Sequence, residues 1–218
     1  MKLLRHLITC ILTIALIWGA MPGALAQNIQ NVQEWPYGQV FLTSGDTITG
    51  YVTYYRHEEI IKVENLKGVY SVSPVNVNGF VVKEYNALTY REFRTLLWNR
   101  QNNPHGFKSP AFFEYIQDGK YSLLKRQIIV ELERQAAFAN PAQLPLHYIP
   151  GKDYQVQELY YLLTPDNRIL RLRKLERDLN YFFGSKANQV KAFVKENKLS
   201  YRNEQDLAVM VRFYNSLL

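Results

Sequence analysis

The side chains best suited to bind a ligand form a run of cations near residue 170. The run consists of Arg168, Arg171, Arg173, Lys174 and Arg177, the most concentrated charge in the sequence. Cations grouped in this way can dock an anionic lipid head group, an acidic polysaccharide or a nucleic-acid backbone. Glu176 and Asp178 lie in the same stretch, so the alternative is a solvated surface balanced by neighbouring acids.

Paired aromatic residues form the second candidate binding feature. The pairs are Tyr54-Tyr55, Phe112-Phe113, Tyr160-Tyr161 and Phe182-Phe183. Neighbouring residues of a strand point to opposite faces, so each strand pair is expected to place one ring inward and one outward. Outward rings among Tyr54, Tyr55, Tyr160 and Tyr161 can stack on sugars or pack against a partner protein. The alternative, which we favour, is that the helices near the C-terminus cover them.

Catalytic chemistry has little support in the sequence. There is no G-x-S-x-G nucleophile elbow, no P-loop and no G-x-G-x-x-G after a strand. Glycoside hydrolysis requires only two carboxylates about 5 to 9 Å apart, and Glu58, Glu59, Glu114 and Glu158 lie on or beside expected strands. We predict no catalytic residue and a non-enzymatic binding or structural module. A hydrolase of an envelope polysaccharide that uses a carboxylate pair is the alternative.

Metal and cofactor sites are not predicted. Beyond residue 26 the histidines are His57, His105 and His147, which fall in separate expected elements. They form no H-x-x-x-H or H-E-x-x-H motif, and no cysteine completes a tetrahedral set. We expect surface or turn histidines, no metal site and no cofactor.

Residues 1–26 contain the three parts of a secretory signal. Lys2 and Arg5 form a basic start, residues 7–18 are an almost unbroken apolar run, and Ala24-Leu25-Ala26 is an A-x-A cleavage site. The apolar run of about a dozen residues is shorter than the roughly 20 that a spanning helix needs. We therefore predict cleavage after Ala26, a periplasmic or secreted location, and no membrane span in the chain that remains.

Cleavage would leave a mildly basic chain without cysteine. The full sequence has 26 Lys+Arg against 19 Asp+Glu and a single cysteine, Cys10, which lies within the expected signal. A thiol-free chain suits an oxidising compartment and excludes thiol catalysis. The excess of cations is too small to indicate nucleic-acid binding, so the expected partners are an anionic envelope component or another envelope protein.

Residues 27–172 are expected to form an antiparallel β domain of roughly eight to ten strands. Alternating segments predict strands at 40–43, 48–55, 60–64, 69–72, 79–84, 112–116, 121–132, 154–163 and 169–172. Gly45, Asp118-Gly119 and Pro165 supply the turn chemistry between them. Three other segments interrupt the pattern: a polar lead-in at 27–34, a short helix or ordered loop within 86–110, and a proline-punctuated connector at 141–150.

The hydrophobic period changes from two to 3.6 at Lys174. Three amphipathic helices are expected in residues 173–218, one ending at Gly184, one following Ser185 and one beginning at Asn203. Each is too short to be stable alone, so all must pack on the sheet or on one another. The expected fold class is α+β, with an antiparallel sheet curled towards a barrel or sandwich and followed by three short helices.

Both ends of this expected domain resemble a known group of proteins. Residues 38–52 read Gly-Gln-Val-Phe-Leu-Thr-Ser-Gly-Asp-Thr-Ile-Thr-Gly-Tyr-Val, and the tail runs from Lys-Glu-Asn-Lys-Leu at 195–199 to Arg-Phe-Tyr-Asn-Ser-Leu at 212–217. With the signal, they resemble uncharacterised secreted β-rich proteins of Bacteroidota-type Gram-negative bacteria. The resemblance is weak between residues 86 and 150. It implies an envelope location and transfers no catalytic residue.

Overall fold

The computed structural model of the 218-residue chain describes residues 31–85, 89–99, 106–133 and 152–218. Within these ranges the strands are β1 (Val32–Leu42), β2 (Thr47–Tyr55), β3 (Ile60–Asn65), β4 (Gly68–Val72), β5 (Val77–Lys83), β6 (Tyr90–Trp98), β7 (Ser109–Gln117), β8 (Ser122–Glu133), β9 (Lys152–Leu163) and β10 (Ile169–Leu172). The helices are α2 (Leu175–Phe183), α3 (Ala187–Glu196) and α4 (Glu204–Ser216), with a 3-10 turn, η3 (Gly184–Lys186), after α2. The expected signal, His105, His147 and the connector at 141–150 lie outside the described residues.

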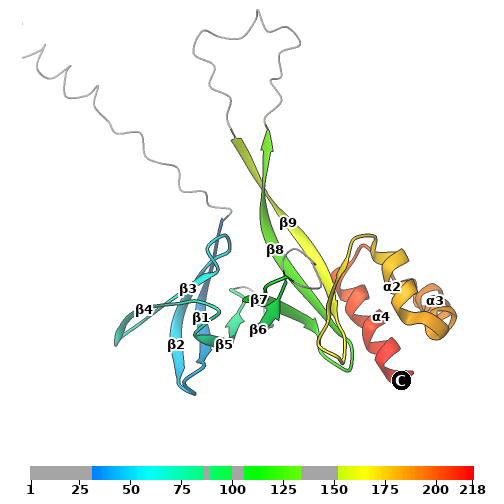
Figure 1. Ribbon diagram of the computed structural model, residues 1–218, viewed down its shortest axis with the longest axis horizontal. Helices are drawn as coiled ribbons and strands as arrows, with labels where there is room; N and C mark the ends of the chain where they lie inside the picture. The colour runs from blue at the N-terminus through cyan, green and yellow to red at the C-terminus, as the bar shows by residue number, and fades with distance from the viewer. Residues whose placement is uncertain (1–30, 86–88, 100–105, 134–151) are drawn as a thin grey trace, which may run out of the picture.

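The described strands form one antiparallel sheet in the order β10-β9-β8-β7-β6-β5-β1-β2-β3-β4 (Figure 1). Two meanders, β1 to β4 and β5 to β10, are joined because β5 pairs with β1. The sheet is open, since β4 and β10 each have one neighbouring strand within the described part of the chain. The antiparallel, β-rich α+β class is therefore confirmed, and the sheet does not close into a barrel.

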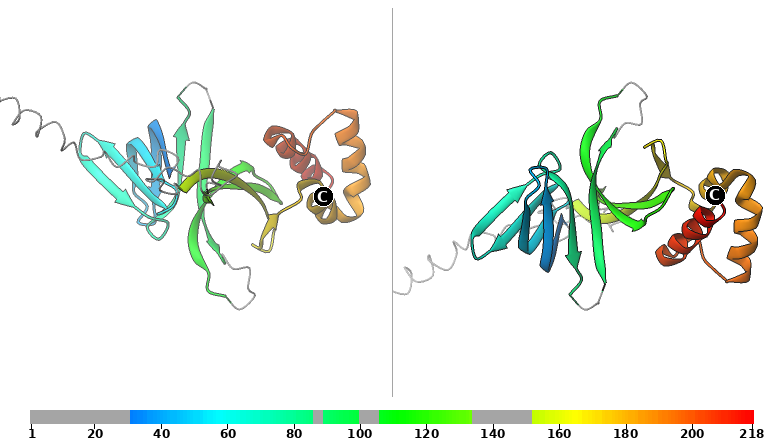
Figure 2. Two further views of the ribbon diagram at one scale, coloured as in Figure 1. Left: turned by 90° about the horizontal axis from the view of Figure 1, so that it is seen from above. Right: turned by 90° about the horizontal axis from the view of Figure 1, so that it is seen from below.

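The open sheet is nevertheless strongly curled (Figure 2). Three strands separate β1 from β8 in the sheet, yet the side chains of Gln33 on β1 and Gln127 on β8 meet at 3.0 Å. In the same region Arg126 of β8 forms an ion pair with Glu59 in the turn between β2 and β3. These contacts fix the curl by joining strands that are distant in the sheet order.

Strand β1 begins earlier than the sequence pattern predicts. Residues 32–34 were expected in a polar lead-in, but Val32 pairs with Tyr55 of β2 and Trp35 pairs with Val52. The register then shifts between Trp35 and Gly38, at the position of Pro36. Proline has no amide hydrogen, so a strand tolerates it where the ladder is irregular. The sequence pattern missed the start of β1 because proline is rare inside strands, whereas this strand continues on both sides of Pro36.

The prediction of a helix or loop within residues 86–110 is wrong for the described part of that segment. Residues Tyr90–Trp98 are β6, which pairs with β5 and with β7. Phe93 points into a core, and Arg91 lies on the same face because it is two residues away along the strand. Arg91 is ion-paired there with Glu114. An arginine on the inner face breaks the apolar alternation that identifies a strand. The pattern was hidden by an ion pair that the sequence does not show.

The described side chains form three hydrophobic cores. Core 1 lies on β1, β2, β3, β5, β6 and β7 and is centred on Phe80, which contacts the rings of Tyr54, Phe93 and Phe112. Core 2 joins Leu123, Leu162 and Leu172 of the sheet to buried residues of α2, α3 and α4. Core 3 contains Phe113, Leu124 and Tyr161. On β8 and β9 it lies on the face opposite to core 2, because neighbouring residues of a strand point to opposite faces.

The helices pack on the sheet and on one another, as expected. Helix α4 contacts β7 and β8, while α2 and α3 pack against each other. The three predicted helices are present, but α2 passes through η3 directly into α3, so the tail consists of two helical stretches. Gly184 ends α2 with a φ of 52°, a left-handed conformation that suits glycine.

Asn203 is the residue that begins α4. Its side-chain oxygen accepts a hydrogen bond of 3.0 Å from the backbone amide of Asp206. Replacing Asn203 with alanine should lower the free energy of unfolding by about 1 kcal/mol, because a first-turn amide loses its acceptor. Urea denaturation measures the change. Asn188→Ala, at an exposed position of α3, is the matched control, and equal effects of the two substitutions would contradict the capping role.

Candidate functional site

The predicted run of cations lies where β10 leaves the sheet and enters α2. Two cavities adjoin at this junction, with volumes of about 450 and 580 Å³. The first is lined by Gln157, Glu158, Leu159, Tyr160, Arg171, Leu172, Arg173 and Leu175. The second is lined by Arg173, Lys174, Leu175, Glu176, Arg177, Tyr201 and Arg202. Because the cavities share Arg173 and Leu175, we treat them as one surface and call it the basic groove.

Four of the five predicted cations line the basic groove, and Arg168 does not. Arg168 is exposed and pairs with Asp166 at 2.5 Å in the turn before β10. Arg177 pairs with Asp178 at 2.8 Å. Arg171, Arg173 and Lys174 are exposed and have no ion pair with any residue that the structure describes. The groove therefore contains positive charge that its own neighbours leave uncompensated.

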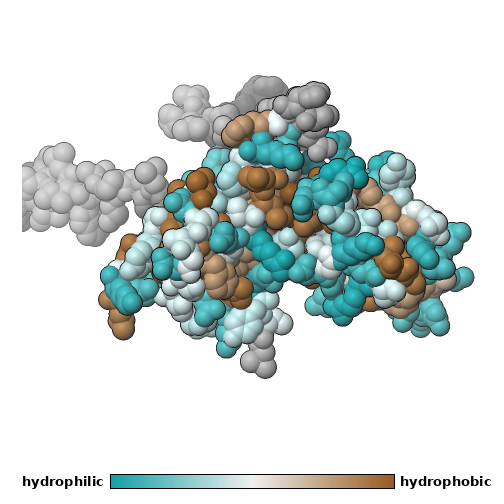
Figure 3. Space-filling model, turned by 60° about the horizontal axis from the view of Figure 1, so that its bottom comes forward, coloured by the Kyte–Doolittle hydropathy of each residue, from teal (hydrophilic) through white to brown (hydrophobic). Residues whose placement is uncertain are grey.

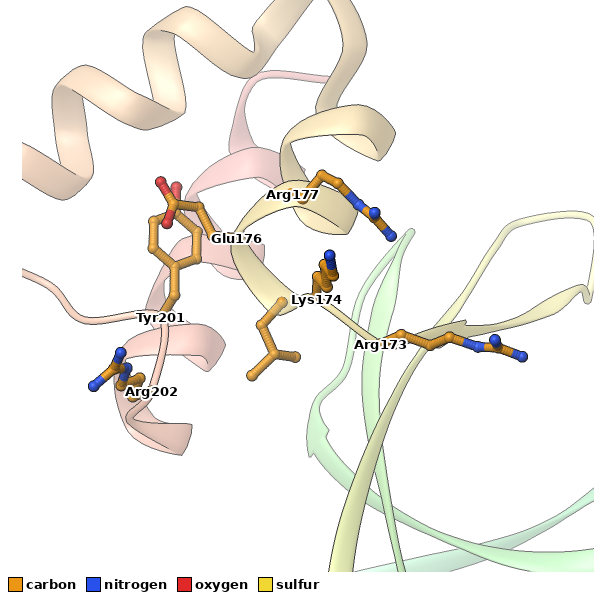
Figure 4. Close-up of a pocket in the computed structure, with 7 residues that line it drawn as sticks. Arg173, Lys174, Glu176, Arg177, Tyr201 and Arg202 are labelled. Atoms are coloured by element: carbon orange, nitrogen blue, oxygen red, sulfur yellow. The ribbon is translucent and has the colours of Figure 1, made fainter.

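The acids of this stretch do not form ion pairs with Arg173 or Lys174 among the described residues. Asp178 accepts hydrogen bonds from the backbone amides of Arg173 and Lys174 at 2.8 and 2.9 Å. Burial raises the pKa of Asp178, but these amides and Arg177 outweigh it, so the pKa lies below its ordinary value. Glu176 lies beside Tyr201, away from the cationic ends of Arg173 and Lys174 (Figure 4). The carboxylate of Asp178 thus shapes the backbone of the groove and leaves the side chains of Arg173 and Lys174 free.

Arg202 is a groove residue that the sequence pattern missed. It precedes α4 and is distant in sequence from the other cations, so no local charge run marks it. Figure 4 shows Arg173 and Arg177 extending towards the strands, while Arg202 lies on the other side of the groove with Tyr201. The cations consequently line an extended surface instead of converging on one point. Such an arrangement suits a ligand with several negative charges.

Of the four predicted tyrosines, two lie in cores, one lines the groove and one lies elsewhere. Tyr54 is 7% exposed in core 1 and Tyr161 is 2% exposed in core 3, so neither forms a binding surface. Tyr55 is half-buried and lies away from the groove. Tyr160 lines the groove, and its hydroxyl lies 2.9 Å from Glu204 and 3.2 Å from Glu158. In each tyrosine pair the two rings lie on opposite faces of the strand, and Tyr54 and Tyr161 are the more buried members.

A set of charged side chains that we call the ionic cluster adjoins the groove and shares Glu158 with it. It consists of Arg91, Glu114, Lys125, Glu158 and Glu204. Arg91 binds both oxygens of Glu114, at 2.6 and 2.8 Å. Lys125, which is 6% exposed, places its Nζ 3.2 Å from Glu114 and 2.7 Å from Glu204. Because Glu204 is in the first turn of α4, the cluster attaches this helix to the sheet.

The pKa of Glu158 does not favour this residue as the general acid of a carboxylate-pair hydrolase. Glycoside hydrolysis needs a general acid whose pKa is raised. Burial raises the pKa of Glu158, but hydrogen bonds from Gln127 and Tyr160 and the charge of Lys125 outweigh it, and the pKa lies below its ordinary value. Both oxygens of Glu114 are already bound by cations. Glu158 therefore keeps its charge to a lower pH than an ordinary glutamate, which is opposite to the change that a general acid needs.

The other acids considered for catalysis lie elsewhere. Glu58 accepts a hydrogen bond of 2.8 Å from Asn31, and Glu59 is paired with Arg126, both at the turn after β2. Among the described residues no group of three or more His, Cys, Asp or Glu side chains could hold a metal ion. His57 is exposed in the same turn. In the described residues no helix has both the length and the apolar character needed to cross a membrane.

The view in Figure 3 shows no large apolar patch that would suggest a second binding surface. Brown apolar patches are small there and are separated by hydrophilic surface. The exposed large apolar side chains are spread over many elements, and include Leu66 before the edge strand β4, Val69 in β4, Phe107 before β7 and Tyr181 on α2. Isolated apolar residues are ordinary on protein surfaces.

Glu158 should make the stability of the protein depend on pH. Its pKa is lower in the folded chain than its ordinary value, so its stabilising contribution is present near pH 7 and is lost as the pH falls through the folded pKa. Glu158→Gln is expected to lower the urea midpoint near pH 7 and to have a smaller effect near pH 3. Glu196→Gln, at the exposed end of α3, is the control. A loss of equal size at both pH values would contradict the assignment.

Comparison with known proteins supplies no relative from which a residue role can be transferred. No family model, curated protein or solved structure matches the chain. The resemblance of residues 38–52 and 195–217 to secreted β-rich proteins stays a prediction. The functional inference is carried by the charge and shape of the basic groove.

Proposed function

We propose that the protein is a non-enzymatic binding module of the cell envelope that holds an anionic envelope component in the basic groove. The observation that carries the proposal is the pairing of two adjoining cavities with exposed cations, Arg171, Arg173 and Lys174, that have no ion pair among the described residues. The fold gains little stability from unpaired cations that are grouped in this way. Ligand binding is the simplest use for it.

The strength of single ion pairs indicates what kind of anion is bound. An exposed ion pair contributes only about 0 to 1 kcal/mol, so a small monovalent anion would bind too weakly to be selected. A ligand with several negative charges can contact Arg171, Arg173, Lys174 and Arg202 together, because these residues line one continuous surface. The proposed ligand is therefore polyvalent.

An exported location supports an envelope component as the ligand. Residues 1–26 have the order of parts found in a secretory signal, and the chain after them contains no cysteine. Under this proposal the protein isolated from an envelope fraction begins at Gln27. N-terminal sequencing of that protein tests the location, and a chain that begins at Met1 would contradict it.

Charge reversal in the groove tests the binding proposal. The probes are poly-L-glutamate, polygalacturonate and vesicles that contain phosphatidylglycerol, each titrated at low and high salt. Arg173→Glu with Lys174→Glu should weaken binding of at least one probe roughly tenfold or more, because two contacts are lost and repulsion is added. Lys191→Glu with Lys195→Glu, at exposed positions of α3, applies the same change in net charge outside the groove.

The control variant separates a site from general attraction by a basic protein. Equal weakening by the two double substitutions would show that the probes respond to net charge alone. Failure of all three probes to bind the unmodified protein would also overturn the proposal.

A further inference from the structure

The outer edge of β9 is only partly covered by β10. Strand β9 spans Lys152–Leu163, whereas β10 pairs only with Tyr160 to Leu163. On the outer side of Tyr154–Leu159 no other strand pairs among the residues that the structure describes. In an antiparallel ladder every second residue directs its amide and carbonyl to one side. This stretch therefore offers a row of main-chain donors and acceptors to an incoming strand.

The uncovered edge lacks three common features that prevent pairing. Exposed edge strands are commonly protected by lysine, proline or a bulge. Residues 154–159 read Tyr-Gln-Val-Gln-Glu-Leu, with no lysine and no proline. The register of β9 with β8 continues without a shift from Lys152 to Leu163. Within the described part of the chain the edge is thus regular and unpaired, and it can extend the sheet.

The groove cations lie at the end of this edge. One cavity of the basic groove is lined by Gln157, Glu158 and Leu159 of β9 together with Arg171 and Arg173. Arg171 pairs directly with Tyr161, so its side chain lies on the face of the sheet that carries Tyr161, Leu159 and Gln157. The other face of the same stretch carries Tyr154, Val156 and Glu158. The two faces differ in charge, with a cation on one and a carboxylate on the other.

We infer that the ligand of the basic groove is an acidic extended peptide segment that adds to β9 as a strand, with its carboxylates on the Arg171 face. This inference rests on the function proposed above and names the class of its ligand. A strand of alternating acidic and apolar residues matches both faces, because the acids meet Arg171 and the apolar residues meet Tyr154 and Val156. Apolar residues there also avoid repulsion by Glu158.

Main-chain pairing distinguishes a peptide from the other anionic ligands. An acidic polysaccharide or a lipid head group can meet Arg171 and Arg173, but neither presents amides and carbonyls at the spacing of a strand. Strand addition takes its affinity from main-chain hydrogen bonds and its specificity from alternate side chains. Both requirements are met between Tyr154 and Leu159, at the margin of the groove.

The test uses a fluorescein-labelled peptide with the sequence Val-Glu repeated four times. A second peptide of the same sequence carries N-methyl groups on alternate residues, which removes hydrogen-bond donors from one edge and keeps the charge. Fluorescence anisotropy with the full chain should give roughly tenfold or more weaker binding of the methylated peptide. Arg171→Glu should weaken binding of the unmodified peptide by a similar factor, and Lys191→Glu should not. Hydrogen exchange should show slower exchange in alternate amides of residues 154–159 when the peptide is bound.

The outcomes separate this inference from the function on which it rests. Equal binding of the two peptides, or unchanged exchange in residues 154–159, overturns strand addition. If polygalacturonate or anionic vesicles bind in a manner sensitive to Arg173→Glu and the Val-Glu peptide does not bind at about 1 mM, the groove binds an anion of another class. In that case the proposed function stands and the inference fails. If no anionic probe binds, both fail.

Discussion

Replacing Lys125 with methionine is expected to lower the free energy of unfolding by about 3 kcal/mol. Lys125 is 6% exposed and lies between Glu114 and Glu204, so its removal takes away a cation that two carboxylates share. Methionine keeps most of the volume of the side chain, which limits the effect of an empty cavity. The loss of free energy of unfolding should be at the low end of the range for breaking a buried ion pair. Glu114 keeps Arg91 as a partner, and the partly exposed Glu204 can turn towards water.

Urea denaturation of Lys125→Met measures this effect, and Lys191→Met on exposed α3 is the matched control, with an expected change within about 0.5 kcal/mol. A double variant that also carries Glu204→Gln should lose less than the sum of the two single changes, because both substitutions remove the same contact. Additive losses would show that Lys125 and Glu204 do not act together. A change no larger than that of Lys191→Met would refute the role of the ionic cluster in stability.

Replacing Phe80 with alanine is expected to cost about 4 kcal/mol of stability. The side chain is fully buried in core 1 and stacks on Phe93 at a centroid distance of 4.3 Å. It also meets Phe112 edge-on at 5.2 Å. Removal of the ring therefore loses transfer free energy, aromatic contacts and close packing at the centre of the sheet's curl.

Phe107→Ala is the matched control for Phe80→Ala, because Phe107 is 88% exposed and the same atoms are removed. Its effect should lie within about 0.5 kcal/mol. Phe80→Leu should recover part of the loss, since leucine fills some of the cavity. If Phe80→Ala cost no more than Phe107→Ala, core 1 would not be the close-packed unit that its ring contacts indicate.

Local patterns predicted much of the β domain correctly. The strands after Gly45, around Asp118-Gly119 and after Pro165 are present, because a turn and an alternation of period two are properties of a few consecutive residues. The predictions failed where distant residues altered the local pattern. Arg91 is tolerated on an inner face by Glu114, and Pro36 by a register shift in β1.

In the candidate site too, local patterns were predicted correctly and contacts between distant residues were not. The cations from Arg171 to Arg177 were recognisable because they are adjacent in the sequence, and four of the five predicted cations line the groove. Arg202 joins them only through the packing of α4. The tyrosine pairs were correctly expected to alternate, but alternation does not say which ring is buried. Burial of Tyr54 and Tyr161 depends on which face receives Phe80, Phe112 and Phe113.

The sequence by itself determined the antiparallel strands, the amphipathic helices and the position of the basic run, because each depends on residues a few positions apart. The tertiary structure alone decided the strand order, the uncovered edge of β9 and the ionic cluster. These features bring together residues as distant as Lys125 and Glu204, whose 2.7 Å contact depends on strand register and helix docking. Contacts of this range follow from the packing of whole elements, and no short pattern of residue types encodes them.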